Sequence, residues 1–279
     1  MEGNIANVGD LAKPVNTLIK KISDAIGVLF EPQRIIRRAK AETQAEEIKA
    51  ISDLKIDELK KRTLARMINE ETKKQENIEN IIDNSLPLLN EQSKPIDIDN
   101  DWLANFFDKA RITSNEQMQT IWSKILAGEA NKPGTFTRRT IKIVSELEIR
   151  DAMLFTNLAK FNFLIGLPTI VIFDCQNDIY NKYGITFNTL KHLDTLGLIS
   201  FESISGYGRQ KLPQDFTISY FHIPIKIRMQ NEKDNTLPIG QVLLTQSGQE
   251  LVQICGSTPE REIIDYSIEQ WKNQGVRIN

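Results

Sequence analysis

Seven apolar residues near the start of the chain fall on one stripe of a helix, at successive spacings of 3, 1, 3, 3, 1 and 3: Val15, Leu18, Ile19, Ile22, Ala25, Ile26 and Leu29. The opposite face carries polar residues, among them Lys20, Lys21 and Asp24. This pattern predicts an amphipathic helix. Gly27 and Pro32 mark its expected end.

Residues 33–83 contain neither proline nor glycine and are rich in Ala, Glu, Lys, Arg, Ile and Leu, a composition that favours a long charged helix. Residues 69–77 include no hydrophobic side chain, which predicts a hinge or break there. The amphipathic helix and the long helix together make residues 1–86 a helical arm.

Pro87 and Pro95 enclose a polar run and mark the expected end of the arm. A compact helical domain is predicted over residues 96–165. Asp99 is placed to cap its first helix, and Ser114 with Gln117 forms a capping box for the second. Gly128 is expected to close that second helix.

The chain changes character over residues 166–279. Strands are predicted at residues 169–173, 198–204 and 242–244, and alternation of apolar and polar residues predicts another at 223–229. Thr186 and Thr245 are placed to cap short helices, and a final helix is expected over residues 259–273. The order helix, strand, long wing, strand, helix favours a winged-helix-like module. The expected fold is therefore mainly α with a small α+β part.

Two phrases and a short loop carry a family resemblance: residues 101–107 (DWLANFF), residues 121–129 (IWSKILAGE) and residues 132–134 (KPG). With them the chain resembles an uncharacterised bacterial family, the domain of unknown function numbered twenty-eight hundred and six. Its members also open with an amphipathic segment like residues 11–36, so the resemblance spans most of the chain. It implies no activity. The N-terminal half is more weakly similar to the abortive-infection alpha proteins, which implies bacterial origin and a role in phage defence.

Composition narrows the class of protein. The chain has 279 residues, 40% of them hydrophobic and 26% charged, with a formal net charge of -2. That balance is typical of a globular protein and excludes an overall basic surface for nucleic acid. Two cysteines far apart in sequence favour a reducing compartment, so cytoplasmic localisation is expected. The sequence contains no run of about 18 apolar residues, so no transmembrane helix is predicted.

Candidate catalytic and metal-binding residues are few, and no catalytic residue, metal site or cofactor is predicted. His192 and His222 are the only histidines, and neither belongs to a group with metal-ligand spacing. Asp97, Asp99 and Asp101 mimic the start of a calcium loop, but Trp102 stands where that loop needs glycine, so helix capping is the better interpretation. The cysteine at 175 lacks a base nearby in sequence, and residues 127–134 lack the Gly-Lys-Ser/Thr ending of a nucleotide loop.

The arm offers the best candidate contact surface: Leu18, Ile19, Lys20, Lys21, Ile22, Ile26, Arg34, Arg37, Arg38 and Lys40. A basic cluster directly after an amphipathic helix fits an anionic surface, which would make the protein peripheral to the inner membrane. The favoured alternative is that the apolar stripe packs on the second helix of its own arm or on a second copy of the chain.

The sequence therefore predicts a non-enzymatic interaction or assembly protein, homo-oligomeric and using its helical arm for protein contact, with membrane contact as an alternative partner. The second hypothesis is a DNA-binding regulator that uses the winged-helix-like module, with Lys191, Arg209 and Lys211 on phosphates. Acidic residues interleaved with these cations weaken it. No motif favours an enzyme.

Overall fold

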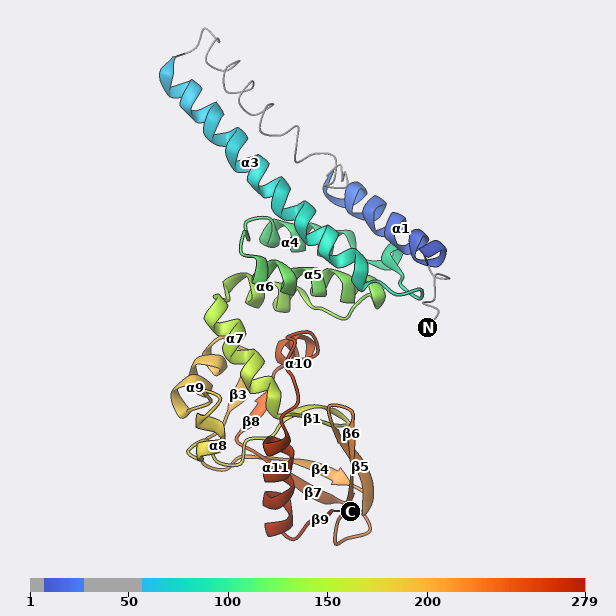
Figure 1. The fold of residues 1–279 in the computed structure, drawn as a ribbon, viewed down its shortest axis with the longest axis vertical. Helices are drawn as coiled ribbons and strands as arrows, with labels where there is room; N and C mark the ends of the chain where they lie inside the picture. The colour runs from blue at the N-terminus through green and yellow to red at the C-terminus, as the bar shows by residue number, and fades with distance from the viewer. Residues whose placement is uncertain (1–7, 28–56, 279) are drawn as a thin grey trace, which may run out of the picture. The chain divides into compact units, whose positions relative to one another are not determined.

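A computed structural model describes residues 8–27 and 57–278 of the chain, and within them helices predominate over strands (Figure 1). The chain divides into two compact units, Met1–Ser145 and Glu146–Asn279. This division differs from the sequence-based one, which placed boundaries at residues 86–96 and 165. Each unit is described by itself below.

Unit 1 is helical. Its elements are α1 (Val8–Ile26), α3 (Glu58–Ser85), η1 (Leu86–Leu88), η2 (Pro95–Asp97), α4 (Asn100–Ala110), α5 (Glu116–Asn131) and α6 (Arg138–Glu146). Aromatic residues from α4 and α5 form its centre. The rings of Trp102 and Phe106 stack at 5.2 Å, and Trp122 meets Phe106 edge-on at 5.3 Å. All three side chains are buried, so the core of the unit lies between these two helices.

The described part of the predicted long helix is α3, and it runs without a break through residues 69–77. The predicted hinge is therefore wrong. Asn77, at the end of that polar run, is buried, and its amide donates to the backbone oxygen of Arg111 at 2.8 Å. A buried amide with a partner in another helix is stable inside a helix, although its sequence neighbours look solvated. Residues 33–56 of the prediction lie outside the described residues.

The ends of α4 and α5 test the predicted caps. Asp99 caps α4 as expected, because its carboxylate accepts a hydrogen bond from the Trp102 amide at 2.7 Å. The capping box of Ser114 with Gln117 is wrong, since Asn115 caps α5 by accepting from the Met118 amide. Gly128 does not end α5, which continues to Asn131.

Residues 86–98, expected to separate domains, belong to unit 1. Leu89, Pro95 and Ile98 are buried there. The Lys94 amide donates to the oxygen of Ala130 at 2.8 Å, which ties this segment to the end of α5. The two prolines therefore mark a packed turn of the unit.

Unit 2 combines helices with small sheets. Its elements are α7 (Ile149–Leu158), η3 (Ala159–Phe161), β1 (Asn162–Ile165), β2 (Leu167–Ile170), α8 (Asp178–Asn181), α9 (Phe187–Thr195), β3 (Ile199–Phe201), β4 (Tyr207–Leu212), β5 (Asp215–Tyr220), β6 (Ile223–Arg228), β7 (Asn235–Gly240), β8 (Val242–Leu244), α10 (Gln246–Val252), α11 (Arg261–Asn273) and β9 (Arg277–Ile278). A five-stranded antiparallel sheet has the order β2-β1-β5-β6-β9, and β3-β8 and β4-β7 form two-stranded sheets.

One face of the five-stranded sheet forms the core of unit 2. Phe163 on β1 contacts Trp271 of α11 at 5.3 Å between ring centroids, and both are fully buried. The alternation predicted for residues 223–229 holds in the middle of β6, where Ile225 and Ile227 are buried and Lys226 is exposed, but Ile223 at the start of the strand is exposed. The opposite face of β6 is therefore open to solvent.

Two predicted pairs of consecutive elements are present in unit 2: α9 followed by β3, and β8 followed by α10. Thr186 and Thr245 cap α9 and α10, and Gly197 ends α9 with a φ of 76°. The strands β3 and β8 pair as antiparallel neighbours. The segment between them is more than the predicted wing, because it contains β4 to β7, two of which extend the five-stranded sheet.

Candidate functional site

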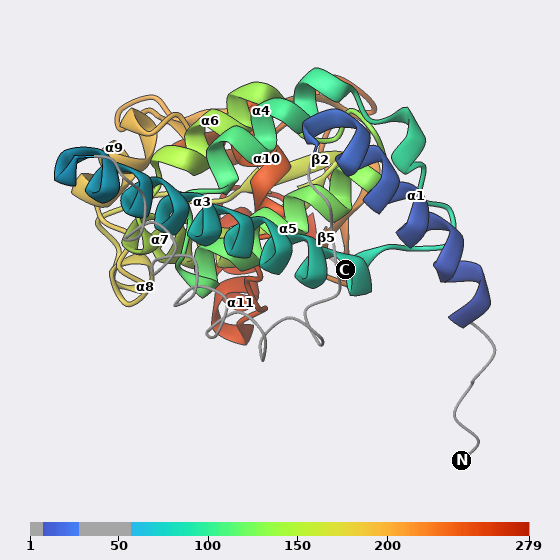
Figure 2. The same cartoon turned by 90° about the horizontal axis from the view of Figure 1, so that it is seen from above.

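The predicted contact residues of the amphipathic helix are divided between its two faces. Leu18 and Ile22 are fully buried, and α1 packs on α4 and η2 (Figure 2). Ile19 and Ile26 are half-buried. Burying two such side chains contributes roughly 3–6 kcal/mol, at about 1.5–3 kcal/mol each. Within the described residues the apolar stripe therefore has partners in its own chain, chiefly α4 and η2.

The basic residues of the predicted surface are only partly described. Lys20 is exposed and Lys21 half-buried on the outer side of α1. With Lys13 they line a shallow hollow that ends at Ile96. The remaining four predicted cations, Arg34, Arg37, Arg38 and Lys40, lie outside the described residues.

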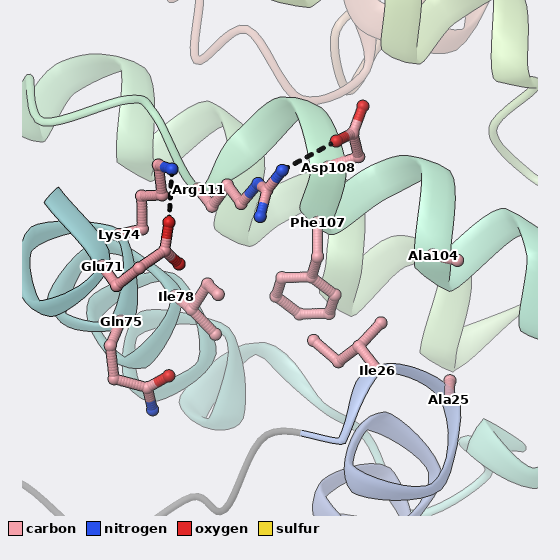
Figure 3. Close-up of a pocket in the computed structure, with 10 residues that line it drawn as sticks. All are labelled: Ala25, Ile26, Glu71, Lys74, Gln75, Ile78, Ala104, Phe107, Asp108 and Arg111. Carbon is pink, nitrogen blue, oxygen red and sulfur yellow. Dashed lines mark hydrogen bonds and ion pairs between the residues drawn. The ribbon is translucent and has the colours of Figure 1, made fainter. Parts of the chain in front are cut away.

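A cavity of about 450 Å³ lies where α1, α3 and α4 meet (Figure 3). Its apolar lining comes from all three helices: Ala25 and Ile26 from α1, Ile78 from α3, and Ala104 and Phe107 from α4. In Figure 3 the side chains of Ile26, Ile78 and Phe107 point toward one another. The first helix of the chain thus forms one wall of a cavity whose other walls belong to the core helices.

Charged residues border this cavity in two pairs. Lys74 donates to Glu71 at 2.6 Å, and the hydrogen bond from Lys74 lowers the pKa of Glu71. Arg111 donates to Asp108 at 3.1 Å. The pKa of Asp108 is lowered mainly by Lys109, with Arg111 adding to the effect. Because each cation faces a carboxylate, the rim is electrically balanced.

The ten residues that line this cavity include no histidine, cysteine, serine or threonine. Its ionisable groups are those of the two pairs at the rim, Lys74 with Glu71 and Arg111 with Asp108. The cavity thus has a charged rim and an apolar floor.

The N-terminal half of α3 carries a second feature. Every buried residue of this helix lies between Asn77 and Ser85. Residues 58–76 instead present exposed apolar side chains: Leu59 is 65% exposed, Leu64 37% and Met67 52%. At about 100° per residue these three side chains fall within about 140° of the helix circumference. These exposed apolar side chains therefore lie on a helix half in which no residue is buried.

The three cations that the sequence predicts to contact DNA, Lys191, Arg209 and Lys211, differ in their burial and in their partners within the chain. Lys191 forms an ion pair with Asp194 at 3.0 Å. Arg209 is half-buried, donates to Thr169 at 3.0 Å and leaves its Nε without a hydrogen-bond partner. Of the three, Lys211 is the one that is exposed and forms no ion pair with another described residue. Two of the three are therefore engaged within the chain.

A histidine–aspartate pair in unit 2 was not anticipated from the sequence. His192 on α9 donates to Asp151 on α7 at 2.7 Å, and Asp151 is buried. Burial alone would raise the pKa of Asp151, but the hydrogen bonds from His192 and the Glu148 amide outweigh it and lower the pKa. The only sequence signal was Asp151 three residues after Glu148, a capping-box spacing. The pair joins two helices of unit 2.

The residues that resemble calcium-loop and nucleotide-loop motifs have structural partners. Asp99 and Asp101 lie 3.1 and 3.6 Å from Arg138 on α6. The buried carboxylate of Glu129 accepts hydrogen bonds from the amides of Gly134 and Phe136, at 2.6 and 2.9 Å. Both motifs therefore hold α4, α5 and α6 together.

The two segments that carry the family resemblance, residues 101–107 and 121–129, both contact Phe136 in the loop after α5. The Trp102 indole donates to the oxygen of Phe136 at 2.7 Å. A Cβ on Gly128 would lie 2.6 Å from the Phe136 ring, so glycine is needed for this close approach. These residues define the core of unit 1.

Residues 8–27 and 57–278 contain no group of three or more His, Cys, Asp or Glu side chains placed to hold a metal ion. Among the helices of these two ranges, none is both long and apolar enough to cross a membrane. Cys175 is buried, and its amide donates to the Gln241 side chain.

Comparison with known proteins gives one match. A family profile described as "Protein of unknown function (DUF2806)" matches residues 61–267. No curated protein and no solved structure matches the chain.

Proposed function

Since the chain belongs to the DUF2806 family, whose function is unknown, its role must be argued from its own residues, and we propose a non-enzymatic interaction and assembly protein. It self-associates through the N-terminal half of α3. The observation that carries this proposal is the exposure of Leu59, Leu64 and Met67 on a helix half that has no buried residue.

The charge pattern of α3 favours a second copy of the chain as the occupant of this surface. The first turns are cationic, with Lys60, Lys61, Arg62 and Arg66 against Glu58. The following turns, up to residue 76, carry Glu70, Glu71 and Glu76 against Lys73 and Lys74. Two such helices packed antiparallel place the cationic turns of each beside the acidic turns of the other.

Protein contact is better supported than insertion of α1 into a lipid surface. Insertion would require Leu18 and Ile22 to leave α4 and η2, which costs roughly the 3–6 kcal/mol that their burial contributes. A membrane could still meet Lys20 and Lys21 without insertion. That weaker contact would disappear as salt screens the charges.

The native mass in solution, measured by light scattering after size-exclusion chromatography, tests the assembly. We expect a multiple of the 31.9 kDa chain for the parent protein. The triple variant Leu59→Gln, Leu64→Gln, Met67→Gln should shift the mass toward one chain. The matched control is Ile204→Gln, because Ile204 is 94% exposed in unit 2 and outside α3. A parent that is monomeric throughout the concentration range rejects the proposal.

Vesicle flotation separates the membrane alternative. The full chain is mixed with vesicles containing anionic lipid and compared with the variant Lys20→Gln, Lys21→Gln. Self-association without flotation supports protein contact alone. Flotation that depends on these two lysines while the mass stays that of one chain would replace the assembly proposal with a membrane one.

A second candidate function is DNA binding by the winged-helix-like part of unit 2. The observation that favours it is the exposed face of α9, which presents Asn188, Lys191, His192 and Thr195 beside the β3-β8 pair. Such a face is typical of a helix that enters the major groove. Salt-dependent retention on duplex DNA, lost in the variant Lys191→Gln, Arg209→Gln, Lys211→Gln, would support it. Cytoplasmic localisation and phage defence remain predictions from the sequence.

A further inference from the structure

The outer face of the five-stranded sheet in unit 2 can be assigned from its strand register. Residues directly opposite one another on neighbouring strands share a face. One row joins Pro168, Leu164, Ser219 and Pro224 across β2, β1, β5 and β6. The next joins Thr217 to Lys226, and the last joins Asp215, Arg228 and Arg277 across β5, β6 and β9. The face is apolar at one end and cationic at the other.

The cationic end contains an unfavourable pair. Arg228 and Arg277 are directly opposite on β6 and β9, where Cβ atoms lie about 4.5–5.5 Å apart. Like charges in this position destabilise a sheet. Asp215 offsets them only weakly, because its carboxylate is 3.8 Å from Arg228 and both side chains are more than half exposed.

Lys226 adds a third cation to the same face. It lies two residues before Arg228, about 6.8 Å along the strand. Within residues 8–27 and 57–278, neither Lys226 nor Arg277 forms an ion pair. The face thus holds three cations against one carboxylate, an arrangement that weakens the fold unless an anion from outside the chain completes it.

We propose that this face binds the phosphodiester backbone of single-stranded nucleic acid, with Arg228, Arg277 and Lys226 on phosphates. Two guanidinium groups on neighbouring strands match phosphate oxygens in charge and geometry. The row of Leu164, Pro168 and Pro224 offers an apolar surface to unstacked bases. No aromatic side chain stands in these rows, so the binding is dominated by charge and indifferent to sequence.

An acidic peptide fits this face less well. A peptide that adds to a sheet gains most of its affinity from main-chain hydrogen bonds along an edge strand. The cations lie on the face, where a peptide finds no free backbone groups. A nucleic-acid backbone needs only charge and side-chain donors.

Fluorescence anisotropy of a labelled single-stranded oligonucleotide of mixed sequence tests the proposal with the full chain. The parent should bind at about 50 mM salt and lose affinity steeply toward about 200 mM. The variant Arg228→Gln, Arg277→Gln should bind more than about tenfold more weakly at the lower salt. Its slope of log affinity against log salt should be smaller by about 1.4, at about 0.7 per phosphate contact.

Two controls place the binding on this face. The variant Arg150→Gln, Arg261→Gln changes two exposed arginines of α7 and α11 that lie outside the three rows, and it should leave affinity and slope unchanged. The thermal midpoint of the Arg228→Gln, Arg277→Gln variant should equal or exceed that of the parent, because the substitution relieves the repulsion between the two arginines. Weaker binding with unchanged or higher stability excludes misfolding as the cause.

Three results would overturn the proposal. The first is no binding by the parent at about 50 mM salt. The second is an unchanged salt slope in the double arginine variant. The third is displacement of the oligonucleotide by polyglutamate as readily as by unlabelled oligonucleotide at equal charge, which would assign the face to an acidic protein segment.

Discussion

The two halves of α3 belong to one continuous helix but are stabilised in different ways. Residues 77–85 bury Ile78, Ile81 and Ile82 against the core of unit 1. No residue of 58–76 is buried, and the ion pairs of this half join neighbours on the same helix, such as Arg66 with Glu70. Packing therefore holds one half, whereas helix propensity and charge pairs hold the other. The half that adds least to the core, residues 58–76, is the one for which we propose self-association.

The largest expected effect comes from truncating one apolar residue in each half of α3 and comparing the losses of stability. Ile81→Ala should destabilise the protein by about 3 kcal/mol, because it leaves a cavity around a fully buried position. Leu64→Ala should change the free energy of unfolding by less than about 0.5 kcal/mol. Urea unfolding, followed at a concentration where both variants have the same oligomeric state, measures the two. Equal losses would show that the N-terminal half is also part of the core.

The buried amide at the junction of the halves gives the next effect. Asn77→Ala removes the donor to the Arg111 oxygen and the acceptor for the Gln119 amide, which lies 3.1 Å away. The expected loss is about 1–3 kcal/mol, since buried partners remain unsatisfied. Asn69→Ala is the matched control, because Asn69 is exposed and alanine favours the helix. Similar unfolding midpoints for the two variants would contradict the role assigned to Asn77.

Asn77 also shows why the sequence predicted a hinge where the helix continues. Within residues 69–77 every side chain is polar, and no local pattern distinguishes the buried Asn77 from the exposed Asn69. The difference arises from Arg111 and Gln119, more than thirty residues away. The prediction that Gly128 ends α5 was wrong for the same reason. Glycine is required at this position because the Phe136 ring lies close to it, and the helix continues to Asn131.

Elements with purely local causes were predicted well. The caps at Asp99, Thr186 and Thr245 depend on neighbours in sequence and are confirmed, as is the alternation of β6 from Ile225 onward. The partner of α1 depends on tertiary packing. The sequence identified its apolar stripe, but no local pattern indicated that α4 and η2 would pack against it. The two arginines of the cationic sheet row are likewise far apart in sequence, and only the strand register brings them together.

A smaller effect separates local from global stability within α3. Met67→Gly should weaken the N-terminal half by about 1 kcal/mol through the lower helix propensity of glycine. Hydrogen exchange should therefore quicken at the amides around residue 67, while protection of residues 77–85 stays unchanged. Met67→Ala is the control for loss of the side chain. Faster exchange throughout both halves would show that they unfold as one unit.

The smallest expected effect concerns the charge pair that spans the middle of the exposed half. Arg66 donates to Glu70 at 2.7 Å, and both side chains are about half exposed or more. Glu70→Gln should weaken this half by about 0.3–0.5 kcal/mol, seen as slightly faster hydrogen exchange of its amides. Because the pair is exposed, the difference should disappear near 1 M salt, where screening extends over only about 3 Å. Met67→Gly acts through the backbone and should keep its effect at high salt. A loss at Glu70 that persists in salt would mean that this carboxylate packs against a second molecule, which would move the edge of the proposed contact surface from Met67 to Glu70.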